Sequence, residues 1–135
     1  MGETVRDYKD LLAWQRAMDL AEEVYRIARK LPREEVFALG DQLRRAAVSV
    51  PSNIAEGSGR DTRKEYANFL SIAIGSIREL ETQLLIAVRV GHLSSADCRS
   101  AFGLLSETSR LLHAIRSKLV PRTSPPTSQP QTCNL

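Results

Sequence analysis

Apolar residues recur along the chain at intervals of three and four residues, which is the spacing of one face of an α-helix. Four such segments cover about residues 10–30, 34–56, 62–91 and 94–119. No segment shows sustained alternation, and no Asn-Gly or Asp-Gly hairpin turn occurs, so strands are not predicted. The segments are similar in length and the connections are short. The pattern therefore predicts an all-α fold, an antiparallel up-down-up-down four-helix bundle.

Residues with known effects on helix ends support these boundaries. Pro32 ends the first helix, and Gly91 ends the third. Pro51 lies inside the second helix, where its ring and its missing amide hydrogen predict a kink. Thr62 and Glu65 fit a reciprocal capping box, in which each side chain bonds the backbone amide of the other.

The first helix carries two adjacent apolar seams, which predicts contact with more than one neighbour. We expect Trp14 and Tyr25 to lie in the core, together with Tyr66 of the third helix. The apolar stripe of the fourth helix includes one polar residue, Thr108. Its hydroxyl is expected to donate to the carbonyl of Leu104, one turn earlier.

The back of the third helix is unusual for a surface facing water. Ile72, Gly75, Glu79, Ile86 and Val90 lie largely away from its core seam. A glycine within a helix costs roughly 1 kcal/mol relative to alanine, and close approach of another backbone is a common compensation. Scattered surface hydrophobic residues are the alternative interpretation. We expect a second packing surface here, as in a homo-oligomer.

A polar stripe follows the second helix directly beside its apolar seam. It consists of Gln42, Arg45, Ser49, Asn53 and Glu56. Polar groups at the margin of a core usually form hydrogen bonds, so the stripe predicts a network with another helix or another subunit. An ordinary solvated boundary row is the alternative. Charge complementarity suggests Arg45 as a partner for Glu79.

Length and composition limit the class of protein. The 135 residues fit one domain, and no run of 18 apolar residues could form a spanning helix. The N-terminal segment lacks the apolar stretch of a secretory signal, and two cysteines give no disulfide framework, so a cytoplasmic protein is expected. Residues 1–9 are expected to form an arm and residues 10–120 the bundle. The Pro/Ser/Thr-rich residues 121–135, with Cys133, are expected to form a disordered tail.

Charge is unevenly distributed along the chain. Residues 1–59 hold nine basic and ten acidic side chains, whereas residues 60–135 hold ten basic and six acidic ones. A solvated basic helix surface would explain this excess. The alternative is nucleic-acid binding through phosphates, since no exposed aromatic residue is evident for stacking on bases. The candidate contacts are Arg60, Arg63, Lys64, Arg99, Arg110 and Arg116.

Residues that support catalysis or metal binding are lacking. Di-iron bundles need Glu-x-x-His motifs, but His92 and His113 each follow an arginine by three residues. The segment Gly57–Arg60 lacks the Lys-Ser/Thr of a phosphate-binding loop, and neither Ser49 nor Ser76 has a nearby histidine base. We therefore expect no enzymatic activity, no catalytic residue, no metal or other cofactor, and no small-molecule substrate.

The central run of the second helix is distinctive. The residues Gln-Leu-Arg-Arg-Ala-Ala-Val-Ser-Val-Pro-Ser-Asn-Ile-Ala-Glu-Gly at positions 42–57, followed by Gly59 and Arg60, resemble the signature of the 23S rRNA-intervening sequence protein family. The resemblance covers about residues 8–120. It places the signature on Gln42, Arg45, Ser49, Pro51, Asn53, Glu56, Gly57 and Glu79. The pattern leaves open whether these residues bind RNA or build an oligomer.

The resemblance implies an assembly more than an activity. Members of this family are antiparallel four-helix bundles that form homopentamers, and they are suspected of associating with ribosomal RNA. They are similar in architecture to accessory bundle proteins of diversity-generating retroelements, which bind nucleic acid and a reverse transcriptase. Two hypotheses follow: a homo-oligomeric bundle associated with ribosomal or other structured RNA, or a protein–protein interaction scaffold without nucleic acid.

Overall fold

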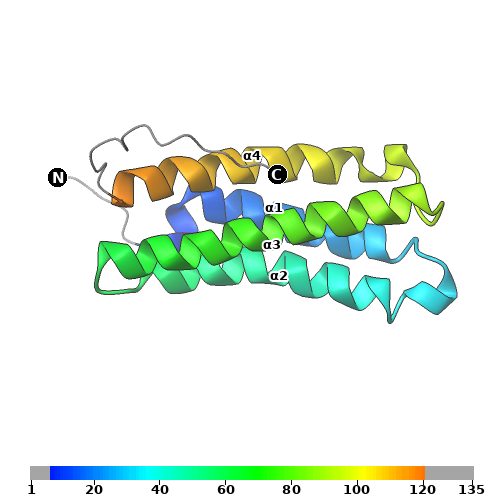
Figure 1. Ribbon diagram of the computed structural model, residues 1–135, viewed down its shortest axis with the longest axis horizontal. Coiled ribbons are helices and arrows are strands. Elements are labelled where there is room, and N and C mark those ends of the chain that lie inside the picture. The colour runs from blue at the N-terminus through cyan, green and yellow to red at the C-terminus, as the bar shows by residue number, and fades with distance from the viewer. Residues whose placement is uncertain (1–6, 121–135) are drawn as a thin grey trace, which may run out of the picture.

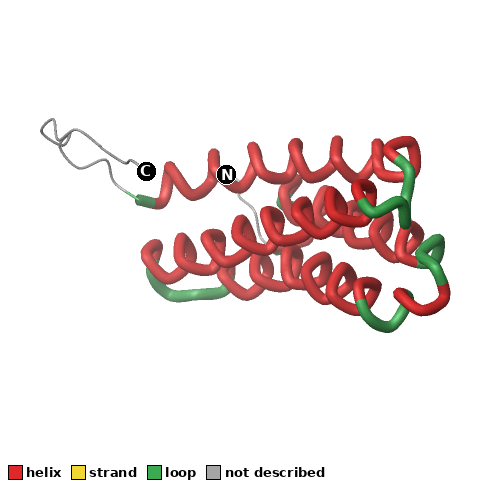
Figure 2. Tube along the Cα trace, turned by 45° about the vertical axis from the view of Figure 1, so that its right-hand side comes forward, coloured by secondary structure: helices red, strands yellow, loops and turns green. Residues whose placement is uncertain are grey.

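The computed structural model describes residues 7–120, and all regular structure in this range is helical. The four α-helices are α1 (Leu12–Ala28), α2 (Leu39–Ser58), α3 (Arg63–Arg89) and α4 (Ser95–Leu119), and two short 3₁₀-helices are η1 (Tyr8–Asp10) and η2 (Arg33–Glu35). Successive helices run in opposite directions (Figure 1) and are joined by short loops (Figure 2). Each helix packs against two others, and α4 closes the ring by contacting α1. The predicted four-helix bundle is confirmed.

Most helix boundaries agree with the expected ones to within two residues. The exception is the start of α2, because η2 and a turn occupy residues 33–38 and the helix begins at Leu39. The helix then continues through the buried Pro51. A kink at this proline stays a prediction. The predicted tail 121–135, with Cys133, and residues 1–6 of the predicted arm lie outside the described residues.

A threonine caps the N-terminus of α3, and a serine caps the N-terminus of α4. The Thr62 hydroxyl accepts a hydrogen bond from the Glu65 amide at 3.1 Å, although no bond from Glu65 back to Thr62 is formed. Ser94 and Asp97 form the complete reciprocal box at the start of α4, with both bonds at 3.0 Å. The hydrogen bond that the Asp97 carboxylate accepts from the Ser94 amide is the main cause that holds the pKa of Asp97 below its ordinary value. Gly91, with φ of 85°, permits the turn after α3.

One of the two seams of α1 is fully buried in the core, and the other is buried only in part. Leu20, Val24 and Ile27 are buried, whereas Tyr25 is 43% exposed beneath the guanidinium of Arg44. α1 does contact two neighbours, α2 and α4, as its two seams predict, but Tyr25 lies at the outer margin of its apolar face. The expectation that Tyr25 lies in the core was therefore wrong.

The other two aromatic residues expected in the core are half-buried. Trp14 packs at the edge of the bundle against the ring of Tyr8, with ring centroids 5.4 Å apart. Tyr66 lies at the α2–α3 contact, and partial burial raises the pKa of its phenol. Gly57 allows this contact, because a Cβ there would lie 2.7 Å from the Cβ of Phe69.

Thr108 is completely buried in α4, and its hydroxyl has no hydrogen-bond partner among the described residues. The expected bond to the carbonyl of Leu104 is therefore absent. A buried hydroxyl without a partner loses its hydration and gains nothing in return, so replacing it with a methyl group of similar shape should stabilise the fold.

We expect Thr108→Val to raise the free energy of unfolding by about 1 kcal/mol in a chemical denaturation experiment. Thr82→Val is the matched control. Thr82 is exposed, its hydroxyl donates to the carbonyl of Arg78 at 2.8 Å, and its replacement should change stability by less than about 0.5 kcal/mol. A less stable Thr108→Val protein would show that the hydroxyl has a partner in solution.

Candidate functional site

The side of α3 that faces α2 carries a polar network. The hydroxyls of Ser49 and Ser76 lie 2.7 Å apart and share a hydrogen bond between the two helices. The side-chain amide of Asn53 donates to both the carbonyl and the hydroxyl of Ser49, at 2.8 and 2.9 Å. The polar stripe predicted on α2 thus bonds to α3 within one chain.

A second part of the network lies further along α3. Gln83 is only 7% exposed, and its amide nitrogen lies 3.4 Å from the Gln42 oxygen and 3.3 Å from a Glu79 oxygen. Its own side-chain oxygen has no partner among the described residues. The sequence interpretation missed both Ser76 and Gln83. Their spacing of seven residues within an apolar helix face was the available signal.

The charged ends of the stripe have different surroundings. Glu56 forms an ion pair with Arg60 at 2.7 Å, and the Arg60 guanidinium lies 4.8 Å from the centre of the Phe69 ring. Arg60 therefore belongs to the α2–α3 side of the bundle. Arg45 is exposed and forms no ion pair with Glu79 within the described part of the chain. The suggested Arg45–Glu79 pair does not form within a single chain.

Exposed apolar side chains lie on α3 beside this network. Ile72, Ile86 and Val90 are 52%, 48% and 58% exposed. Gly75 lies on the same outer surface, and a Cβ there would meet no atom of the described chain within 4 Å. We name the surface formed by Ile72, Gly75, Glu79, Ile86 and Val90 the apolar face of α3. It leaves room for close approach by another molecule.

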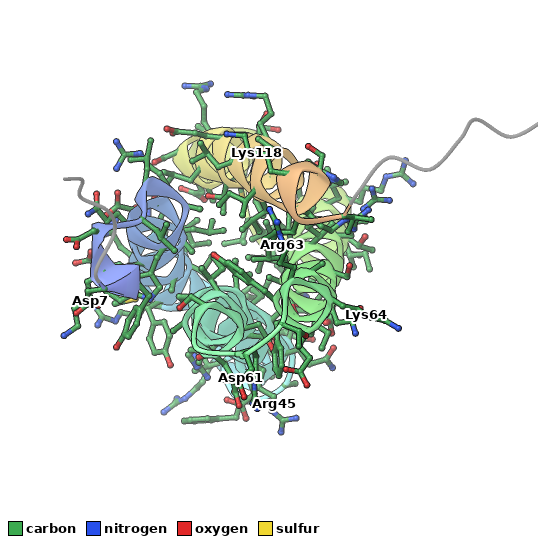
Figure 3. The ribbon with its side chains drawn as sticks, turned by 90° about the vertical axis from the view of Figure 1, so that its left-hand side faces the viewer. Asp7, Arg45, Asp61, Arg63, Lys64 and Lys118 are labelled. Atoms are coloured by element: carbon green, nitrogen blue, oxygen red, sulfur yellow. The ribbon has the colours of Figure 1, made fainter. Side chains whose placement is uncertain are left out.

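The opposite side of α3 meets α4 and collects basic residues. At the end where α4 finishes, Arg63 donates to the carbonyl of Lys118 at 3.4 Å, and Arg116 donates to the hydroxyl of Ser71 at 3.1 Å. In Figure 3 the labelled Arg63 and Lys118 lie near one another, and Lys64 extends outward from the beginning of α3. Predicted contacts from both helices are therefore brought together at this end.

A surface groove lies between the middle parts of α3 and α4. Its lining includes Ile77 and Leu105, with Arg78 from α3 and Arg110 from α4. Arg110 donates to the hydroxyl of Ser106, which also lines the groove, at 2.9 Å. The groove thus combines two guanidinium groups from different helices with hydroxyl groups.

Further basic residues lie between this groove and the turn that joins α3 to α4. Arg89 follows Arg78 by eleven residues, and Arg110 follows Arg99 by eleven, which is about three helical turns. Each pair therefore lies on one flank of its helix. Because α3 and α4 are antiparallel, Arg89 and Arg99 both lie near the turn, beyond the Arg78–Arg110 groove. The sequence interpretation missed Arg78 and Arg89, although this spacing was visible.

Most carboxylates of α3 and α4 lie away from this flank. Glu107 pairs with Arg16 of α1 at 3.0 Å, and Asp97 bonds to Ser94 and to Lys30. Glu79 lies on the α2 side, and Glu65 is about 140° around α3 from Arg78. Among the described residues, Glu81 is the one carboxylate lining the groove.

Positive charge is therefore concentrated on the α3–α4 flank. We name it the basic face. Its basic residues are Arg63, Lys64, Arg78, Arg89, Arg99, Arg110 and Arg116.

The described residues contain no group of three or more His, Cys, Asp or Glu side chains placed to hold a metal ion. Within the same range, no helix combines the length and the apolar character needed to cross a bilayer.

A comparison with protein-family models identifies the family of this chain. The model described as 23S rRNA-intervening sequence protein matches residues 9–114, which is most of the chain. This chain belongs to that family. The family membership that the sequence resemblance indicated is thereby confirmed. A search of curated proteins finds no significant match.

A solved structure supports the fold of this family member. It is the 1.70 Å crystal structure of a protein of unknown function from the S23 ribosomal protein family of Bacteroides thetaiotaomicron. The two chains are 22% identical with a TM-score of 0.73, and the match covers 78% of this chain and 98% of the other. At this identity the likeness establishes the shared bundle.

Proposed function

We propose that this protein is a non-enzymatic, self-assembling four-helix bundle that associates with ribosomal or other structured RNA. The observation that carries the proposal is the basic face, where α3 and α4 present facing arginines and a single carboxylate lines the groove between them. Such a surface attracts a polyanion, because each contact between a guanidinium and a phosphate releases a condensed counterion.

The arrangement of the basic face favours phosphates over bases as the groups contacted. Arg78 and Arg110 flank one groove, and Arg89 and Arg99 lie about 16 Å further along the helices. No aromatic side chain lines this groove, so stacking on unpaired bases is not provided for. We therefore propose recognition of an RNA backbone and its shape, with weak dependence on sequence.

Self-assembly would use the apolar face of α3. A closed ring with an odd number of subunits needs two different surfaces that fit each other. The second surface is proposed on α1 and α2, where Met18, Tyr25 and Val48 are exposed. Arg45 lines a shallow pocket with Tyr25 and Val48, and is well placed to meet Glu79 of a neighbouring copy.

The homopentamer implied by the family resemblance is the proposed assembly. Five chains, each with a net charge of +3, would carry +15. This total would strengthen attraction to RNA, because the potentials of neighbouring basic faces add together.

Titration of a labelled ribosomal RNA hairpin with the full-length protein tests the proposed function. We expect binding at about 50 mM salt, and at least a tenfold loss of affinity at about 200 mM, because several phosphate contacts are involved. No binding at the lower salt concentration would contradict RNA association.

The apolar face of α3 also supports a second candidate function, a protein–protein interaction scaffold that does not bind nucleic acid. This alternative predicts that a nuclease-treated pull-down retains a defined protein partner and that the titration detects no binding of the labelled RNA hairpin. Retention of that partner should then depend on Ile72 and Ile86.

A further inference from the structure

Glu81 places a negative charge in a surface that otherwise attracts phosphates. It lines the α3–α4 groove together with Arg78 and Arg110, where its negative charge opposes a phosphate ligand. Its side chain forms no hydrogen bond and no ion pair with any other described residue, so the Glu81 carboxylate is available as an acceptor. A ligand that presents only negative charge would bind more tightly if the Glu81 carboxylate were removed.

The other polar groups of the groove limit what Glu81 can recognise. Thr82 donates its hydroxyl hydrogen to the carbonyl of Arg78, and Ser106 accepts from Arg110. The hydroxyl of Ser109 also lines the groove and can donate to a phosphate. The guanidinium groups are donors only, and the carboxylate is an acceptor only. The groove is therefore complementary to a ligand that presents a phosphate next to a hydroxyl donor. In a nucleic acid, that combination is a phosphodiester beside a ribose 2′-hydroxyl.

We propose that Glu81 accepts a hydrogen bond from a 2′-hydroxyl of an RNA strand whose phosphates contact Arg78 and Arg110, and that the groove thereby selects RNA over DNA. The inference rests on the proposed RNA-binding function. The 2′-hydroxyl distinguishes the two nucleic acids at a given site. DNA would meet the same carboxylate without a donor to offset the repulsion, so its affinity is lowered.

The test compares three versions of one labelled hairpin: RNA, 2′-fluoro RNA and DNA. The 2′-fluoro strand keeps the A-form helix but removes the donor, so it separates hydroxyl recognition from helix shape. Wild-type protein should bind RNA at least about tenfold more tightly than 2′-fluoro RNA, the effect of one hydrogen bond to a charged group.

Glu81→Ala should reduce the ratio of the RNA and 2′-fluoro RNA affinities to about one and raise the affinity for DNA. Glu22→Ala is the matched control. Glu22 is an exposed residue of α1, so its removal changes the net charge equally at a distance from the groove. The control should keep the wild-type ratio. Circular dichroism of each variant checks that the bundle is intact.

The outcomes separate this inference from the proposed function. If wild-type protein binds RNA and 2′-fluoro RNA equally, or if Glu81→Ala keeps the wild-type ratio, the role of Glu81 is overturned while RNA binding stands. If wild-type protein binds no RNA at low salt, the proposed function fails, and the role of Glu81 fails with it.

Discussion

Replacing Ile86 with glutamate should abolish the proposed assembly and leave a monomer of 15.0 kDa. Ile86 is 48% exposed on the apolar face of α3, and Glu79 lies on the same face two turns earlier. A second carboxylate would have to be desolvated in the proposed interface next to this existing charge. Burial of such a charge without a partner costs several kcal/mol, more than one contact of a moderate interface supplies.

Leu85→Glu provides a closely matched control for this prediction. Leu85 is also 48% exposed and is the adjacent residue of α3, but it lies about 100° around the helix, toward α4. Multi-angle light scattering at micromolar concentration should give the same multiple of 15.0 kDa for Leu85→Glu and wild-type protein, and the monomer mass for Ile86→Glu. A wild-type monomer, or equal dissociation of both variants, would refute assembly through the apolar face.

The sequence predicted the bundle well, because a spacing of three and four residues has one structural explanation when it persists over twenty residues. It was less informative about which apolar side chains are buried. The two seams of α1 have the same spacing and neighbouring positions, so Tyr25 and Val24 both looked like core residues. The choice between them depends on where α2 and α4 pack, which is a tertiary property.

Part of the candidate site was visible in the sequence for the same reason. The stripe through Ser49 and Asn53 repeats at helical spacing beside an apolar seam, which indicates a bonded margin. Its partners Ser76 and Gln83 were missed because identifying them requires the register of α3 against α2. Arg78 was missed because its role depends on which flank of α3 meets α4.

The second large effect concerns the basic face. The double variant Arg78→Glu with Arg110→Glu should lower the affinity for a structured RNA hairpin by about 100-fold or more. Both arginines line the central groove from opposite helices. Their reversal removes two charge-assisted phosphate contacts and places two carboxylates beside Glu81, so the groove would repel the backbone it is proposed to bind.

A control with the same change in net charge separates local contact from the general field of the protein. Arg29 follows the end of α1 and Arg33 lies in η2, and both are exposed and outside the α3–α4 groove. Arg29→Glu with Arg33→Glu changes the charge of each chain by the same four units. These charges lie outside the groove and are partly screened by salt, so the loss of affinity should stay below about tenfold.

Measuring both double variants side by side against one labelled hairpin at about 50 mM salt tests the proposed RNA binding by the basic face most directly. We expect a loss of about 100-fold or more for Arg78→Glu with Arg110→Glu, and a loss below about tenfold for Arg29→Glu with Arg33→Glu. Equal losses in the two variants would show that net charge alone attracts the RNA, and would contradict a binding site on this face.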